Sequence, residues 1–144
     1  MRYVAIAFFA LAALRCEAGD FTGSALEVTG KRGSTDRHIW EQVDRVVSVV
    51  AREHHLSPGP TNPNRPDYLL SEKMYYAYYP TRNGTNIDVT YRRQLYRPIE
   101  IEILEIGVRR PSRSHRALLR DFRSGLSKSG LLVKRGQTQQ VATD

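Results

Sequence analysis

The sequence predicts an α+β domain built as a two-layer sandwich, in the order helix, three-stranded antiparallel meander, helix, with both helices on one face of the sheet. Two segments repeat apolar residues at intervals of three and four, which predicts amphipathic helices. Between them, three segments alternate apolar and polar residues, which predicts strands with one buried face. The length of 144 residues suits a single domain, which we place at residues 34–135.

The first helix is expected from about Asp36 to His55, because Ser34, Thr35 and Asp36 each offer an oxygen for its N-cap. A proline-rich loop over residues 57–67 should follow it. The buried stripe of this helix consists of Trp40, Val43, Val47, Val50 and His54.

Two strands over Lys73–Tyr79 and Thr85–Arg92 are expected to form a hairpin, because Asn83-Gly84 between them suits a type I′ turn. This turn sets the register so that Tyr76 lies opposite Tyr91.

The same register places Tyr75 opposite Arg92, with Tyr75 and Tyr79 on the sheet face away from the helices. Exposed aromatic rings beside an arginine would form a contact surface for a protein or a glycan. The alternative is that the proline-rich loop covers that face and buries both rings.

The third strand is expected at Ile99–Ile106. Its first three isoleucines point one way, while Glu100 and Glu102 point the other way. Leu104 and Ile106 change the phase of this alternation, which predicts a bulge or burial of both faces near that end.

The second helix should begin after Pro111, with Ser112 as its N-cap and Gly130 as its C-cap. A short edge strand is expected at residues 131–133 and a polar tail at residues 136–144. The apolar stripe of the helix consists of His115, Leu118, Leu119, Phe122 and Leu126.

Residues 1–18 have the pattern of a secretory signal peptide: basic Arg2, an apolar run over Tyr3–Leu14, and small residues before a cleavage site after Ala18. The chain is therefore expected to be exported, either to the periplasm and cell envelope or into the medium. Residues 19–33 contain four glycines and are expected to form a flexible lead.

An alternative concerns the only cysteine. The segment from Leu11 to Cys16 resembles a bacterial lipoprotein signal, although Arg15 stands where such signals carry a small residue. That resemblance implies lipidation of Cys16, so that the membrane would be reached only through the signal peptide or a lipid anchor.

The formal charge of +7 is concentrated in the second half of the chain, where residues 91–144 carry 12 basic and 5 acidic side chains. Arginines repeat along one side of the second helix, and two more precede it. Such side chains can grip phosphate or carboxylate groups, although an ordinary solvated helix face has the same appearance. The candidate binding residues are Arg109, Arg110, Arg113, Arg116, Arg120 and Arg123.

The sequence shows no catalytic or metal-binding motif. The four histidines lack the i, i+4 spacing of a helical zinc pair, and no G-x-S-x-G motif occurs. We therefore expect neither a metal nor a cofactor. A small hydrolase using His115 with Glu100 or Glu102 is the weakest of the hypotheses.

The leading hypothesis is an exported, noncatalytic domain that binds a macromolecular partner, either a protein or another envelope component. The alternative is an anionic polymer, such as lipid headgroups or an acidic glycan, bound through the arginines of the second helix. Nucleic acid is not an expected partner, because the signal peptide directs the chain out of the cell.

Overall fold

The computed structural model describes residues 20–59, 70–78, 86–94, 97–136 and 140–141. The predicted signal peptide, Cys16 and Tyr79 lie outside the described residues, as does most of the proline-rich loop. The elements in chain order are β1 (Phe21–Thr29), α2 (Asp36–Glu53), β2 (Ser57–Pro58), β3 (Leu70–Tyr78), β4 (Asn86–Gln94), β5 (Ile99–Ile106), α3 (Arg113–Lys128), β6 (Leu132–Arg135) and β7 (Gln140–Val141).

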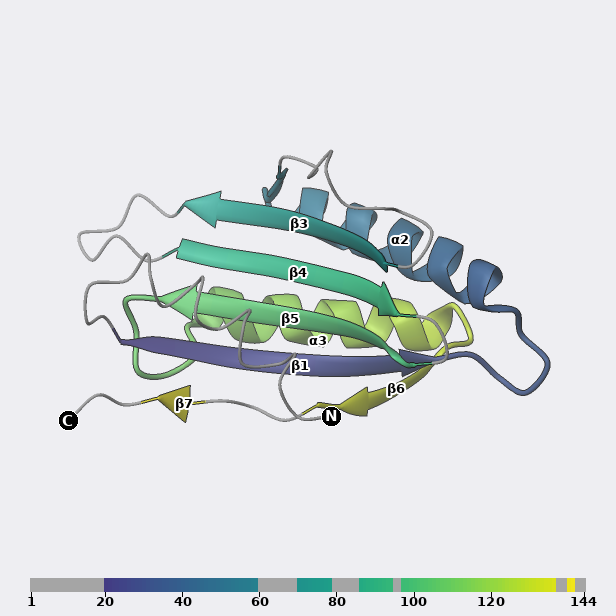
Figure 1. The fold of residues 1–144 in the computed structure, drawn as a ribbon. Helices are drawn as coiled ribbons and strands as arrows, with labels where there is room; N and C mark the ends of the chain where they lie inside the picture. The colour runs from purple at the N-terminus through teal and green to yellow at the C-terminus, as the bar shows by residue number, and fades with distance from the viewer. Residues whose placement is uncertain (1–19, 60–69, 79–85, 95–96, 137–139, 142–144) are drawn as a thin grey trace.

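The predicted α+β class is confirmed, with two helices and an antiparallel sheet. The strand order is β2-β3-β4-β5-β1-β6, and β7 pairs with β1 farther along the same edge. The four long strands β3, β4, β5 and β1 lie side by side in the middle of this sheet (Figure 1).

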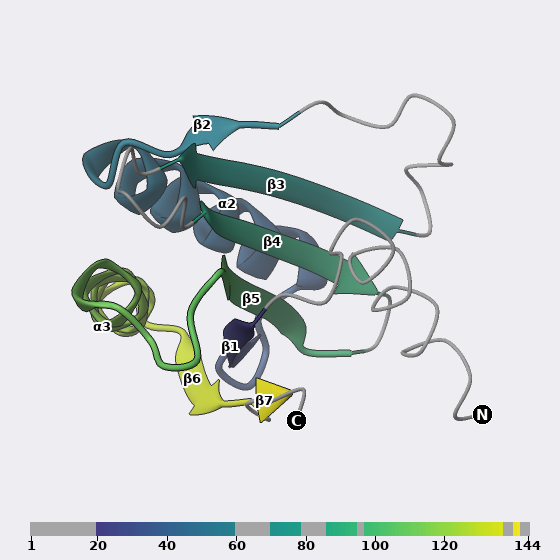
Figure 2. The same ribbon diagram turned by 90° about the vertical axis from the view of Figure 1, so that its left-hand side faces the viewer.

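The two helices lie on the same side of the sheet (Figures 1 and 2). Each begins at a side-chain cap, as the sequence predicts: Thr35 accepts a hydrogen bond from the backbone of His38, and Ser112 from that of His115. Each cap satisfies an amide that would otherwise have no partner in the first helical turn.

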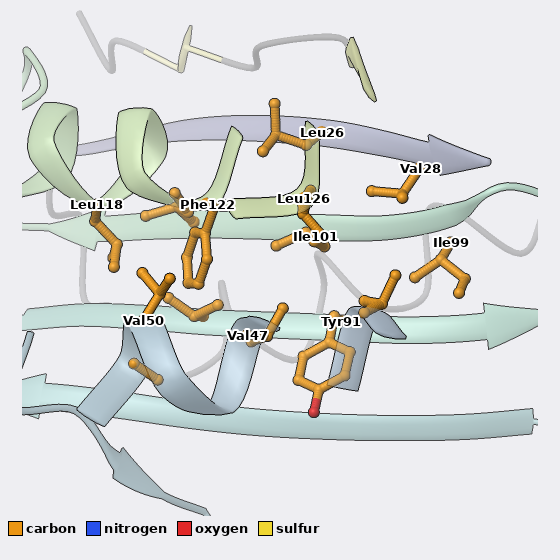
Figure 3. Close-up of a cluster of buried hydrophobic side chains, with 14 of the residues drawn as sticks. Leu26, Val28, Val47, Val50, Tyr91, Ile99, Ile101, Leu118, Phe122 and Leu126 are labelled. Carbon is orange, nitrogen blue, oxygen red and sulfur yellow. The ribbon is translucent and has the colours of Figure 1, made fainter. Parts of the chain in front are cut away.

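The core fills the space between the helices and the sheet (Figure 3). Val47 and Val50 reach it from α2, while Leu118, Phe122 and Leu126 reach it from α3. The side chains that meet them from the sheet are Leu26, Val28, Ile87, Val89, Tyr91, Ile99, Ile101 and Ile103. We call this the helix-facing side of the sheet and the opposite one its outer side.

The expected flexible lead over residues 19–33 is wrong, because Phe21–Thr29 forms the long strand β1 between β5 and β6. Four of its residues point to the helix-facing side, and two of them, Thr22 and Ser24, carry hydroxyl groups. Because these inward positions carry polar groups, the segment lacks the apolar alternation from which a strand is predicted.

The predicted hairpin pairs β3 with β4, but its register is wrong by three residues. Tyr75 pairs with Val89, and Arg92 pairs with Glu72 rather than with Tyr75. Because an odd shift turns every side chain to the other face, Tyr75 lies on the helix-facing side of the sheet.

Strand β5 runs without the expected bulge, since its pairing with β1 and β4 continues without interruption. Its buried positions alternate regularly through Ile103 to Glu105, which is 1% exposed on the helix-facing side. The change of phase in the sequence therefore reflects the burial of the Glu105 carboxylate. Its neighbours Leu104 and Ile106 lie on the outer side.

The carboxyl-terminal segment also joins the sheet. The expected edge strand is found as β6 at Leu132–Arg135, where it pairs with β1. Part of the expected polar tail is ordered too, because Gln140 and Val141 pair with the beginning of β1. Neither helix in the described part of the chain is long and apolar enough to cross a membrane.

Candidate functional site

The arginines of α3 lie on its solvent-exposed side. Its buried side consists of His115, Leu118, Phe122 and Leu126, which pack on the sheet and α2. Leu119 packs against the edge of this core, and the opposite side of the helix faces solvent, because 3.6 residues complete each turn. Four arginines there are exposed and follow one another along the axis: Arg113, Arg116, Arg120 and Arg123. We call these four the α3 arginine row.

Few contacts neutralise the α3 arginine row. Arg116 donates to the carbonyl oxygen of Pro111 at 2.7 Å, which leaves its charge uncompensated. Arg120 binds the carboxylate of Asp121 at 2.8 Å. Arg113 and Arg123 have no side-chain partner among the described residues. At least three of the four guanidinium groups can therefore receive an outside anion.

Asp121 is the only acidic residue of α3, and it is already engaged. Its carboxylate contacts the Nε2 atom of His54, at the end of α2, at 2.9 Å, in addition to Arg120. The hydrogen bonds from Arg120 and His54 hold the pKa of Asp121 below its usual value. The negative charge of Asp121 is therefore already compensated by Arg120 and His54 within the protein.

The two arginines ahead of α3 differ from one another. Arg109 forms an exposed ion pair with Asp20 at 3.0 Å, which ties the approach to α3 to the beginning of β1. Arg110 is exposed and has no ion-pair partner among the described residues. Arg110 therefore extends the basic surface, whereas much of the charge of Arg109 is compensated.

Two residues of the expected surface, Tyr75 and Arg92, do not lie together, while Tyr79 is outside the described residues. The hydroxyl group of Tyr75 is 2.9 Å from the hydroxyl of Ser48 in α2, and its ring stacks at 6.2 Å on that of Tyr91. Arg92 lies on the outer side of the sheet and donates to Glu100 at 2.9 Å. Tyr75 and Arg92 are thus on opposite sides of the sheet.

Asp44 of α2 organises a partly buried polar cluster that sequence reasoning missed. Its carboxylate accepts hydrogen bonds from Lys73 and from the hydroxyl of Tyr91, both at 2.5 Å. Burial alone would raise the pKa of Asp44, but these two donors outweigh burial and lower it. Burial and the bond to Asp44 raise the pKa of Tyr91. The cluster joins α2 to β3 and β4.

A second polar cluster, also missed, lies beneath the first turn of α3. The Nε2 atom of His115 is 2.9 Å from the hydroxyl of Ser24, and its Nδ1 atom is 3.3 Å from the carboxylate of Glu105. Glu105 also accepts a hydrogen bond of 3.0 Å from the backbone of Ser112. Burial lowers the pKa of His115, although the carboxylate of Glu105 acts in the opposite direction.

The order Ser24, His115, Glu105 has the connectivity of a serine hydrolase triad. Its members are nevertheless 8%, 0% and 1% exposed, and the two best-formed clefts of the described residues are lined by other side chains. Among the described residues, the Ser24 side chain is therefore covered by its neighbours. The expectation that His115 would act with Glu100 or Glu102 is wrong, because both glutamates alternate with the inward isoleucines of β5 and lie on the outer side.

Sequence reasoning missed Ser24, Asp44 and Glu105 for one reason. Their partners lie 91, 47 and 10 residues away respectively, so that no local motif connects them. One local signal did exist: the acidic residue at position 105 interrupts an apolar alternation. In the described residues, no group of three histidine, cysteine or acidic side chains is arranged to hold a metal ion.

No family model matches this chain, and no curated protein matches it either.

Proposed function

We propose that the chain is an exported, noncatalytic domain that binds a macromolecular partner with an acidic surface through the α3 arginine row. The observation that carries the proposal is the row itself: four exposed arginines on a helix whose only acidic residue already has two partners. Arginine suits this role because its planar guanidinium group binds carboxylate or phosphate through two parallel hydrogen bonds.

The remainder of the domain supports this use of α3. We take the fold as a two-layer scaffold, with β3, β4 and β5 as a meander and both helices over one face. The buried polar cluster at His115 fixes the beginning of α3 against β1 and β5. A helix held in this way presents its outer side without reorganisation, which lowers the entropic cost of binding.

A second candidate partner is an anionic polymer, such as an acidic glycan or a surface of lipid headgroups. The spacing of the row favours it, because Arg113 and Arg123 are separated by ten residues, or about 15 Å along the helix axis. A straight line of charges of that length matches repeated anionic groups. Such binding should weaken steeply with salt.

The test compares two variants of equal net charge. One replaces Arg113, Arg116, Arg120 and Arg123 by glutamine; the control replaces four exposed arginines outside α3, namely Arg32, Arg37, Arg45 and Arg52. Retention on an acidic polysaccharide column and on anionic vesicles is measured for both. The α3 variant should lose roughly ten-fold or more in affinity, since bonds to charged groups contribute about 1.5–3 kcal/mol.

Protein partners are sought with a photo-crosslinking residue at the exposed position Ser127 of α3, with Arg52 in α2 as the control position. A partner recovered from Ser127 and not from Arg52 supports a protein. Equal weakening of the two glutamine variants, together with no crosslinked partner specific to Ser127, rejects the proposal.

A further inference from the structure

A cleft of about 420 Å³ lies where β1 ends and α2 begins. Val28 of β1 and Ile99 of β5 form one wall, and Ile39 of α2 forms another. Val28 and Ile99 belong to the core, so the cleft is the place where the space between the sheet and α2 meets solvent. Its volume lies within the range of small-molecule sites, about 300–1,000 Å³.

The cleft is lined by both apolar and charged side chains. The apolar side chains that line it are Ile39, Pro98, Val28 and Ile99, of which Val28 and Ile99 are only 1% and 3% exposed. Among the described residues, two arginines from separate segments line it, Arg93 at the end of β4 and Arg97 before β5, together with the carboxylate of Asp36; Arg97 also has an interaction within the protein. The side chains that line the cleft therefore combine an apolar interior with an excess of positive charge.

Arg93 is held in place by an aromatic ring. Its guanidinium carbon lies 5.7 Å from the centre of the Trp40 ring, which in turn packs at 5.3 Å against the buried ring of Tyr91. At this distance the guanidinium charge is attracted to the face of the ring, and its N–H groups can still donate to an anion. Trp40 thus positions Arg93 before any ligand arrives.

Lys31 also lines the cleft, but it is not the main anion ligand. Its Nζ atom lies near Gly130, within 3.9 Å of the place that a Cβ atom there would occupy. The ammonium group is therefore directed toward the end of α3. Its charge adds to the positive potential around the cleft without a direct contact.

We propose that this cleft binds a small amphipathic anion, that is, a carboxylate or phosphate monoester carried on a short aliphatic chain. Arg93 and Arg97 hold the anionic head, and the aliphatic interior receives the chain. The site is separate from the α3 arginine row, since no residue of that row lines the cleft. It would give the domain a small-molecule ligand in addition to its macromolecular partner.

The test titrates isotope-labelled protein with hexyl phosphate, inorganic phosphate and 1-hexanol and follows the backbone amide signals. Hexyl phosphate should bind at least ten-fold more tightly than either fragment, with the largest shifts at Val28, Gly30, Ile39 and Ile99. Equal affinity for hexyl phosphate and inorganic phosphate overturns the proposal, because the apolar interior would then contribute nothing.

Variants locate the anionic head. Arg93→Gln and Arg97→Gln should each weaken binding of hexyl phosphate about ten-fold, since each removes a charge-assisted hydrogen bond. The control is Arg32→Gln, an exposed arginine near the cleft that does not line it, and it should bind as the parent does. An equal loss in Arg32→Gln shows attraction by net charge alone and overturns the proposal.

A final variant separates this site from the proposed function. The protein with all four arginines of the α3 row replaced by glutamine should retain the parent affinity for hexyl phosphate. A ten-fold loss in that variant would assign the phosphate to α3 and reject the cleft. Urea unfolding of each variant confirms that a change in binding is not a loss of fold.

Discussion

The Nε2 atom of His115, in the first turn of α3, lies 2.9 Å from the hydroxyl group of Ser24 in β1. Both side chains are buried, and 91 residues of sequence separate them. Together with the contact to Glu105, this bond fixes the beginning of the helix that carries the arginine row.

The stability of the domain should fall in mild acid because of His115. Burial lowers the pKa of His115 below its value of 6.5 in the unfolded chain, so between these two values the unfolded state binds more protons. The free energy of unfolding should therefore decrease as the pH falls below about 6.5 and continue to decrease down to the folded pKa. The two charged groups near His115 shift its pKa in opposite directions: Glu105 raises it and Arg116 lowers it.

Urea unfolding at intervals from pH 7.5 to pH 4.5 measures this dependence. His115→Gln should flatten it, whereas His38→Gln, at an exposed position, should preserve it. If the free energy of unfolding depends on pH equally in His115→Gln and in the parent protein, a group other than His115 causes this dependence.

Removing the hydroxyl of Ser24 should destabilise the domain by about 1–3 kcal/mol, because the buried Nε2 atom of His115 then has no hydrogen-bond partner. Ser24→Ala is compared with Ser127→Ala, a similar change at an exposed position of α3. Chemical unfolding measures both. A cost below 0.5 kcal/mol for Ser24→Ala would contradict the importance of this bond.

Replacing Asp44 by alanine should cost about 1–3 kcal/mol at neutral pH, because the hydroxyl of Tyr91 loses its acceptor and Lys73 its counter-charge. Its lowered pKa means that this stabilisation is complete above the unfolded value of 3.8 and is lost as the pH falls through the folded pKa. The difference in unfolding free energy between Asp44→Ala and the parent should therefore be constant from pH 5 to pH 7.

The control for Asp44 is Glu41→Ala, which removes the exposed i,i+4 ion pair with Arg37. Such pairs contribute about 0.3–0.5 kcal/mol. Similar costs for the two substitutions would show that the cluster at Asp44 behaves as an ordinary surface pair.

Gly125 allows α2 and α3 to approach closely. A Cβ atom added there would lie 2.8 Å from Cγ1 of Val46, which is too close for an unstrained contact. Gly125→Ala should therefore destabilise the domain by about 1–3 kcal/mol, despite the higher helix propensity of alanine.

A second substitution tests the cause. Val46→Ala removes the methyl group that the added Cβ atom meets, so the double variant should be more stable than the sum of the two single effects predicts. If the two changes in the free energy of unfolding are simply additive, the contact between the added Cβ atom and Val46 is not the cause of the destabilisation.

The helices could be predicted from the sequence because their signals are local. Thr35 and Ser112 each cap the beginning of a helix whose apolar stripe starts within the next turn, and both N-caps agree with the prediction, whereas the C-cap of α3 is Ser129 rather than Gly130. The arginine row could be placed on an exposed helix side for the same reason, since the positions of Leu118 and Phe122 fix the buried side.

The register of β3 could not be predicted, because tyrosines stand at positions of both parities in that strand. Either face of such a strand satisfies an alternation rule. The choice is made by contacts with a distant element: Tyr75 meets Ser48 and Lys73 meets Asp44, both on α2. The cleft between Arg93, Arg97 and α2 depends on the same non-local packing.

The position of β1 also sets the order in which the domain can be completed. Although β1 stands near the beginning of the chain, it pairs with β5 across 71 to 85 residues, from Val28 with Ile99 to Phe21 with Ile106. Pairing over such distances slows folding, because a long loop must close before any contact forms. During synthesis β1 therefore cannot pair with β5 until Ile99–Ile106 has been made, after both β3 and β4.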